Sequence, residues 1–228
     1  MKSRSEKSSY IGHRRRLRDK FMSNPQYMLD YELLEILLFY VFQRKDTKPL
    51  AKAMLNYFKS LRKIILADRF DLKQINGVGE STINLITVVR EIFTRSLLEK
   101  VIESDSIMST GQVLEYYKNA LGYLKKEQLR IMFLNNKNKL IAEEMMQEGT
   151  VNNTAIYPRE IIQKTLEYGA SAIIMVHNHP GGDPKPSRQD IIMTKIINEI
   201  AQKLDIILFD HVVIGRMGAT SFRDLGII

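Results

Sequence analysis

The spacing of apolar residues changes near residue 105 and divides the chain into two halves. Before that point, apolar residues recur three or four positions apart, which predicts helices over Asp30 to Phe42, with Asp30 as N-cap, and Leu50 to Phe58. The same spacing predicts helices over Phe70 to Ile75 and Ser81 to Leu97. The first half is therefore expected to be all-helical.

A glycine-containing turn, Asn76 to Gly79, joins the last two predicted helices. Gly77 and Gly79 can both take positive φ and expose N–H groups beside a helix N-terminus, a geometry suited to phosphate. The turn resembles the helix-hairpin-helix motif, which binds the DNA backbone without sequence preference, although Ile83 stands where that motif usually has a small residue. An ordinary corner between two helices is the alternative reading.

The second half has shorter apolar runs, several of them typical of strands. Two such runs flank the turn-forming tetrad Asn135 to Asn138 and predict a β-hairpin. The expected elements are strands over Leu129 to Leu134 and Leu140 to Met145, a helix from Tyr157 that ends before Gly169, a buried strand over Ala172 to Val176, a helix over Arg188 to Leu204, and strands over Ile206 to Phe209 and Val212 to Ile214. The second half is therefore expected to be α/β.

The composition limits the chemistry that the chain can support. The sequence has no cysteine, which excludes disulfides, thiolate zinc sites and cysteine nucleophiles and leaves any metal to histidine and carboxylate ligands. No run approaches the roughly 20 apolar residues that span a bilayer, so we expect no membrane association. A cytoplasmic setting fits both observations.

The excess of positive charge lies in the first half. Residues 1–105 hold 20 Lys and Arg against 13 Asp and Glu, whereas residues 106–228 hold 14 against 13. Residues 1–20 form a basic N-terminal segment in which only Glu6 and Asp19 are acidic. Two interpretations remain open: this half contacts a polyanion such as DNA, or the segment is a solvated or disordered tail.

The candidate chemistry follows the buried strand that ends at Val176. His177 and His179 are two positions apart, so in extended backbone they project to the same face and can bind one ion about 2.0–2.1 Å away. Beyond a loop rich in glycine and proline, Ser187 and Asp190 read as a capping box, which is compatible with ligation by Asp190. Two histidines and one aspartate leave the fourth tetrahedral position to water, so we predict one catalytic Zn²⁺ per chain.

These residues also resemble a known family. His177-x-His179-Pro180 followed by Ser187-x-x-Asp190 is similar to the JAMM signature of MPN-domain metalloproteases, and within that superfamily the chain resembles RadC proteins. The residues that carry the RadC likeness are His177 to Pro180, Tyr157 to Glu160, Asp210 and His211, Gly12 to Arg14, Asp30 to Leu34, and Lys48 to Ala51.

The resemblance implies a fold as well as a site. It implies an α/β domain of the MPN/JAMM type, with a mixed sheet flanked by helices, preceded by an all-α domain like a helix-hairpin-helix. The expected divisions are a basic segment over 1–20, the all-α domain over 21–104 and the metalloprotease-like domain over 105–228.

The superfamily also uses a glutamate that precedes the first histidine. We choose Glu127, because it stands just before the predicted strand in the context Glu-x-x-x-Ile-Met-Phe-Leu. In this interpretation Glu127 is the general base and Ser187 donates a hydrogen bond to the oxyanion of a peptide or isopeptide substrate. The other candidates, expected to be solvent-facing charges, are Glu143, Glu144 and Glu148.

Three functions stay open. The first is a zinc metallopeptidase, the second a DNA-binding repair or recombination protein with a vestigial or regulatory metal domain, and the third a small-molecule amidase. A zinc deaminase is excluded because it needs Cys-x-x-Cys. We expect His211 to be a core or supporting histidine rather than a fourth ligand, and His13 to lie on the surface. The oligomeric state is not predicted.

Overall fold

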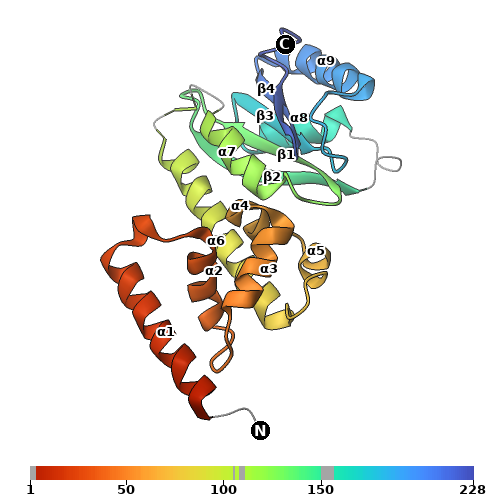
Figure 1. The fold of residues 1–228 in the computed structure, drawn as a ribbon. Coiled ribbons are helices and arrows are strands. Elements are labelled where there is room, and N and C mark those ends of the chain that lie inside the picture. The colour runs from red at the N-terminus through yellow and green to blue at the C-terminus, as the bar shows by residue number, and fades with distance from the viewer. Residues whose placement is uncertain (1–3, 105, 108–110, 150–156) are drawn as a thin grey trace. The chain divides into compact units, whose positions relative to one another are not determined.

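The computed structural model describes residues 4–104, 106–107, 111–149 and 157–228, and side chains from residue 12 onward within these ranges. The chain forms two compact units, Met1–Ile92 and Phe93–Ile228 (Figure 1). The expected domain boundary falls at residue 105, which lies outside the described residues. None of the described helices has the length and apolar character needed to cross a membrane.

The first unit is all-helical, as the periodicity predicts. Its buried core joins residues from five helices and includes Leu38, Met54, Ile64, Leu72 and Ile86. Ile83 is part of the same core, so the larger residue at this position of the helix-hairpin-helix pattern is accommodated by packing. The helices are α1 (Arg4–Ser23), the 3-10 helix η1 (Pro25–Tyr27), α2 (Asp30–Phe39), α3 (Lys48–Phe58), α4 (Leu61–Ile65), α5 (Arg69–Lys73) and the first part of α6 (Glu80–Glu103).

Two local expectations about this unit are wrong. Asp30 is the first helical residue of α2 and not its N-cap; the cap is Leu29, whose N–H donates to the carboxylate of Glu32 at 3.0 Å. Leu29 has no polar side chain with which to cap the helix, but the carboxylate of Glu32, three positions on, accepts from its backbone N–H as in a capping box. Of the two turn glycines, only Gly77 has positive φ, at 93°.

The basic N-terminal segment is helical over its described part, and it is anchored to the unit by polar as well as apolar side chains. Arg14 is 8% exposed, lies over the ring of Phe39 and donates to the carbonyls of Phe42, Gln43 and Lys45. It therefore satisfies carbonyl groups just beyond the end of α2. The Nε2 atom of His13 lies 2.8 Å from the buried carboxylate of Glu35, so the expectation of a plain surface histidine is wrong.

The second unit is built on a five-stranded mixed sheet in the order β2-β1-β3-β4-β5. Strands β3 and β4 are parallel, and every other neighbouring pair is antiparallel. This arrangement confirms the predicted fold class. The elements are α7 (Gly111–Ala120), β1 (Glu127–Leu134), β2 (Leu140–Gly149), α8 (Pro158–Glu167), β3 (Ala172–Asn178), α9 (Arg188–Gln202), β4 (Ile207–Gly215) and β5 (Gly218–Ser221).

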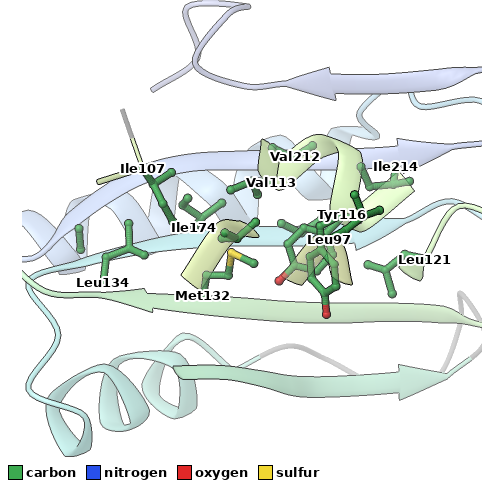
Figure 2. Packing of buried hydrophobic residues seen from close by; sticks show 14 residues of the cluster. Leu97, Ile107, Val113, Tyr116, Leu121, Met132, Leu134, Ile174, Val212 and Ile214 are labelled. Atoms are coloured by element: carbon green, nitrogen blue, oxygen red, sulfur yellow. The ribbon is translucent and has the colours of Figure 1, made fainter. Parts of the chain in front are cut away.

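Helices cover both faces of this sheet, so its central strand β3 is buried throughout. Helix α7 and the last part of α6 pack on one face, where Val113 and Leu97 meet Ile174 and Val212 (Figure 2). Helices α8 and α9 cover the other face, next to Met175. Because side chains alternate along a strand, His177 continues the α9 face and Asn178 the α7 face.

The expected break between two C-terminal strands is wrong. Asp210 and His211 lie inside the single strand β4 and are almost fully buried. The carboxylate of Asp210 accepts from the N–H of His211 at 2.7 Å, the hydroxyl of Ser221 at 2.7 Å and the N–H of Arg223 at 3.2 Å. These partners satisfy the buried polar group, so it does not interrupt the strand.

Candidate metal centre

The candidate site lies at the carboxyl end of β3, where the chain leaves the sheet for α9. In α/β sheets, ligands bind at the carboxyl ends of strands, beside the start of the next helix. His177 is the second-last residue of β3, and His179 follows the strand directly. Strand β1 runs antiparallel to β3 and pairs Leu129 with His177, so the start of β1, with Glu127, reaches the same edge.

The predicted ligands converge at this edge. The Nε2 atoms of His177 and His179 are 3.0 Å apart. The two carboxylate oxygens of Asp190 lie 3.5 Å from the first of these nitrogens and 3.4 Å from the second. A carboxylate oxygen of Glu127 and one ring nitrogen of each histidine all lie within 4.8 Å of one another. Glu127 and Asp190 thus both lie close to the same pair of histidines.

Ser187 fixes Asp190 through the predicted capping box. Its hydroxyl oxygen accepts from the N–H of Asp190 at 3.1 Å, and the carboxylate of Asp190 accepts from the N–H of Ser187 at 2.7 Å. The capping box therefore directs the carboxylate back towards β3, so capping and ligation are compatible. Ser187 itself is exposed, and its hydroxyl proton is free to donate because the capping bond uses only the oxygen.

The loop between His179 and Ser187 is held on the sheet by its backbone. The N–H of His179 donates to the carbonyl of Ile214 at 2.8 Å, and Gly182, at φ 95°, accepts from the N–H of Met217 at 3.1 Å. The loop can lie this close to β4 because residue 215 is a glycine: a Cβ at that position would stand 2.3 Å from the carbonyl oxygen of Gly182. The loop is therefore a fixed support for the histidines.

A chain of hydrogen bonds sets the tautomer of His177. The hydroxyl of Thr194 must donate to the carbonyl of Asp190, 2.6 Å away, because a carbonyl only accepts. The Nδ1 of His211, 2.6 Å from the same hydroxyl, must then carry a proton. Burial lowers the pKa of His211 well below its ordinary value, so this histidine is neutral and its Nε2 accepts from the Nδ1 of His177 at 2.9 Å. In its neutral form, His177 therefore carries its lone pair on Nε2.

The neutral form of His179 likewise carries its lone pair on Nε2, because its Nδ1 lies 3.0 Å from the carbonyl oxygen of Asp183 and must donate to it. Two nitrogen lone pairs and a carboxylate therefore face one another, an arrangement that requires a cation. In the metal-free protein a proton on these nitrogens can take the place of that cation: burial raises the pKa of Asp190, but the hydrogen bonds that His177 and His179 then donate hold it well below its usual range. The hydrogen bond with Asp190 in turn raises the pKa of His179. The donor set fits a divalent ion that accepts nitrogen and oxygen ligands, such as zinc.

The rival glutamates are bonded elsewhere. Glu143 accepts from the hydroxyl of Tyr116 at 2.8 Å and from Arg130 at 3.1 Å, and its side chain is only 13% exposed, so the expectation of a solvent-facing charge is wrong for it. Among the described residues, Glu127 has no hydrogen-bond partner of its own. The remaining pairs are Glu144 with Tyr168 and Lys164, and Glu148 with Lys126 and Gln128.

Sequence reasoning missed two residues that support the site. Thr194 lies one helical turn after Asp190, a spacing that places it on the same side of α9 and could have drawn attention to it. Asn178 stands between the two histidines and is 1% exposed, which the sequence alone does not indicate. His211 was expected to be a core or supporting histidine rather than a fourth ligand; it is buried and contacts His177.

One comparison with known protein families bears on this region. A family model described as the RadC-like JAB domain matches residues 107–227. The matched span is more than half of the chain and holds the whole sheet of the second unit, the capping box and the candidate ligands.

Proposed function

Because the chain belongs to the family of RadC-like JAB domains, as its motifs predict, we propose that it is a zinc-dependent hydrolase that cleaves a peptide or isopeptide bond. The observation that carries the proposal is the convergence of His177, His179 and Asp190 with both Nε2 lone pairs directed inward. The family membership supports the class of bond. One zinc ion per chain would be held by these three side chains.

When bound, zinc acidifies a water molecule towards a pKa of about 7 and polarises the carbonyl group of the substrate. Glu127 is the general base of the proposal, because it is the one carboxylate at the site that no other described group binds. It would take the proton of the water and deliver it to the nitrogen of the leaving amine. Ser187 would donate its free hydroxyl proton to the oxyanion of the substrate.

The metal part of the proposal is tested by zinc content. We expect one zinc per chain in the purified protein, and its loss in His177→Ala and Asp190→Ala. His13→Ala is the matched control, because this histidine also pairs with a carboxylate but lies in the other unit. Zinc retained by both site variants, or absent from the wild type, would overturn the proposal.

The hydrolase part is tested by comparing cleaved termini across a proteome treated with wild-type or Glu127→Gln protein. The substitution removes the proton acceptor and keeps the size of the side chain, so zinc content should persist while new termini disappear. New termini would identify a peptidase. A small-molecule amidase on the same site would leave the two profiles alike yet hydrolyse simple amides in a manner that depends on Glu127.

We also propose that the first unit binds the DNA backbone. The turn with Gly77 at positive φ precedes the N-terminus of α6, and the amine of Lys45 would lie 3.8 Å from a Cβ built on that glycine. N–H groups and a cation together suit a phosphate. The negative charge of Glu80, the first residue of α6, would repel a phosphate, although it is balanced by Arg69 at 2.9 Å and Lys73 at 2.8 Å.

The test is binding to duplex DNA as a function of salt. Lys45→Glu should weaken binding. It should also make the slope of log affinity against log salt shallower by about one unit, the contribution of one phosphate contact. Lys52→Glu, in the same unit but beside Tyr31, is the control. Binding should persist in His177→Ala; if no salt-sensitive binding is measured for the wild type, this second function is excluded.

A further inference from the structure

Asn178 has a buried side chain whose hydrogen bonds all lead to the segment that carries Glu127. Its Oδ1 accepts from the N–H of Gln128 at 2.9 Å, and its Nδ2 donates to the carbonyl of Lys126 at 3.1 Å. A longer contact of 3.5 Å joins the same nitrogen to the carbonyl of Leu124. The orientation of the amide is fixed, because a backbone N–H only donates and a carbonyl only accepts.

The position of these bonds explains why a side chain is needed. The backbone ladder between β1 and β3 ends at the pair Leu129 and His177. Beyond it, the backbone of Asn178 pairs on its other side with Ile214 of β4. The side-chain amide of Asn178 has one acceptor and a donor, as a peptide group has, so it continues the ladder towards the start of β1.

Glu127 is the residue between the two backbone groups that this amide binds. The carbonyl of Lys126 belongs to the peptide group before Glu127, and the N–H of Gln128 belongs to the peptide group after it. Both peptide groups that flank Glu127 are therefore held by one side chain. Since the side chain of Glu127 has no hydrogen-bond partner among the described residues, its position depends on its backbone, which on the other side pairs with Gly149 of β2.

We propose that Asn178 is the positioning residue for Glu127, holding it at a set distance from the metal ligands His177 and His179 on either side of Asn178. The inference rests on the proposed function, because it assigns Asn178 a role through the general base. A purely structural role, closing the end of the sheet, is the alternative. The two differ in whether removing Asn178 has any effect once Glu127 has lost its charge.

A first experiment measures the contact directly by amide hydrogen exchange. In Asn178→Ala, the N–H of Gln128 loses its acceptor, and its exchange should accelerate about tenfold or more, whereas that of Ile131 in the middle of β1 should not change. Asn178→Asp keeps the acceptor and loses the donor, so Gln128 should stay protected while the bond to Lys126 is lost. Unchanged exchange at Gln128 in Asn178→Ala would overturn the inference.

A second experiment uses acetohydroxamate as a probe of the zinc-loaded protein. This ligand chelates zinc through its oxygens and donates a proton to a neighbouring carboxylate, so its affinity reports where Glu127 stands. Glu127→Gln should weaken binding about tenfold, the scale of a charge-assisted hydrogen bond. Asn178→Ala should weaken binding by a similar factor, and the double variant should bind no more weakly than Glu127→Gln alone. Asn119→Ala, which removes a buried amide from α7 of the same unit, should leave affinity unchanged.

The outcomes separate the two proposals. If the wild type binds one zinc and the probe depends on Glu127, but Asn178→Ala behaves as Asn119→Ala does, the positioning role is wrong and the proposed function stands. If the effects of Asn178→Ala and Glu127→Gln add in the double variant, Asn178 acts on the fold and not through Glu127. If the wild type binds no zinc, both proposals fail.

Discussion

The Nδ1 atom of His177 lies 2.9 Å from the Nε2 atom of His211, in the interior of the second unit. His211 is 2% exposed, stacks on Phe222 with ring centroids 4.5 Å apart, and receives its own orientation from Thr194. This contact holds the ring of His177 and keeps the proton on Nδ1. The lone pair of a proposed ligand is thus set by a residue in the neighbouring strand.

Replacing His211 should therefore weaken metal binding without touching a ligand. In His211→Ala, the Nδ1 of His177 loses its partner and the ring can turn or change tautomer, so zinc affinity should fall about 10- to 100-fold. Competition with a chromophoric chelator measures this change. His13→Ala serves as control, and an affinity equal to that of the wild type would show that the contact has no role in binding.

Thr194 gives a milder version of the same test. Thr194→Val keeps the shape and removes the hydroxyl, which leaves the Nδ1–H of His211 buried without an acceptor. The free energy of unfolding should fall by about 1–3 kcal/mol, and zinc affinity should fall less than in His211→Ala. Urea unfolding and the same competition measure the two quantities. Thr165→Val, which removes a buried hydroxyl on α8 bonded only within its helix, is the control for stability.

Much of this site is local in sequence and could be predicted from it. The apolar run that ends at Val176 predicts a buried strand, and the capping box at Ser187 predicts the start of α9, because both signals involve residues next to one another. The structure extends the strand by two residues, so His177 and Asn178 belong to it. This extension matters because it gives the two residues opposite faces of the sheet.

The parts that could not be predicted depend on distant residues. Asp210 and His211 look like a break between strands, yet Ser221 and Arg223 satisfy the carboxylate inside β4. Asn178 acts on a segment about fifty residues away, and no local pattern records that pairing. Helix α7 was not expected either. A polar group can be buried only where it finds hydrogen-bond partners, and in these cases the partners are too far away in the sequence for a local pattern to show them.

The ion pair between Asp190 and His179 predicts how pH affects the metal-free protein. The raised pKa of His179 means that its contribution to stability is complete below 6.5, the ordinary value, and is lost as pH rises through the raised pKa. The lowered pKa of Asp190 means that its contribution is complete above 3.8 and is lost as pH falls through the lowered pKa. The pair therefore stabilises the metal-free protein most between these two values.

Zinc and a proton compete for His179, so zinc affinity should decline as pH falls through the raised pKa of this histidine. Zinc dissociation constants measured from about pH 5 to pH 8 locate the midpoint. Asp190→Asn removes the charge that raises the pKa, so its weaker binding should decline at lower pH than in the wild type. A midpoint that does not move would contradict the assignment of the pair.

Ser187 caps α9, and its proposed second role is to donate to the oxyanion; two variants distinguish the two. Ser187→Ala removes both the cap and the hydroxyl donor, so the free energy of unfolding should fall by about 1 kcal/mol. Ser187→Gly costs only about a few tenths of a kcal/mol as a cap, yet also lacks the donor. If the hydroxyl stabilises the oxyanion, both variants should lose about 10²-fold in kcat/KM on a peptide identified by its new termini. If kcat/KM instead fell in Ser187→Ala but little in Ser187→Gly, as stability does, Ser187 would act only as a helix cap.

Gly215 and Gly181 form a matched pair for testing the loop that supports the histidines. A Cβ on Gly215 would stand 2.3 Å from the carbonyl oxygen of Gly182 and 2.8 Å from the nitrogen of Pro184, whereas a Cβ on Gly181 would meet nothing within 4 Å. Gly215→Ala must therefore push the loop away from β4. We expect a loss of about 1–3 kcal/mol in stability together with weaker zinc binding, because the loop carries the carbonyl that binds His179.

The control, Gly181→Ala, should change neither quantity by more than about 0.5 kcal/mol, since the added methyl group lies in open space. Urea unfolding with and without a fixed excess of zinc measures both effects in one experiment, because the stabilisation by bound zinc rises with the logarithm of its affinity. If Gly215→Ala lowered stability by the same amount in both conditions, the loop would support the fold without supporting the proposed metal ligands. A smaller stabilisation by zinc in Gly215→Ala than in Gly181→Ala is the expected result.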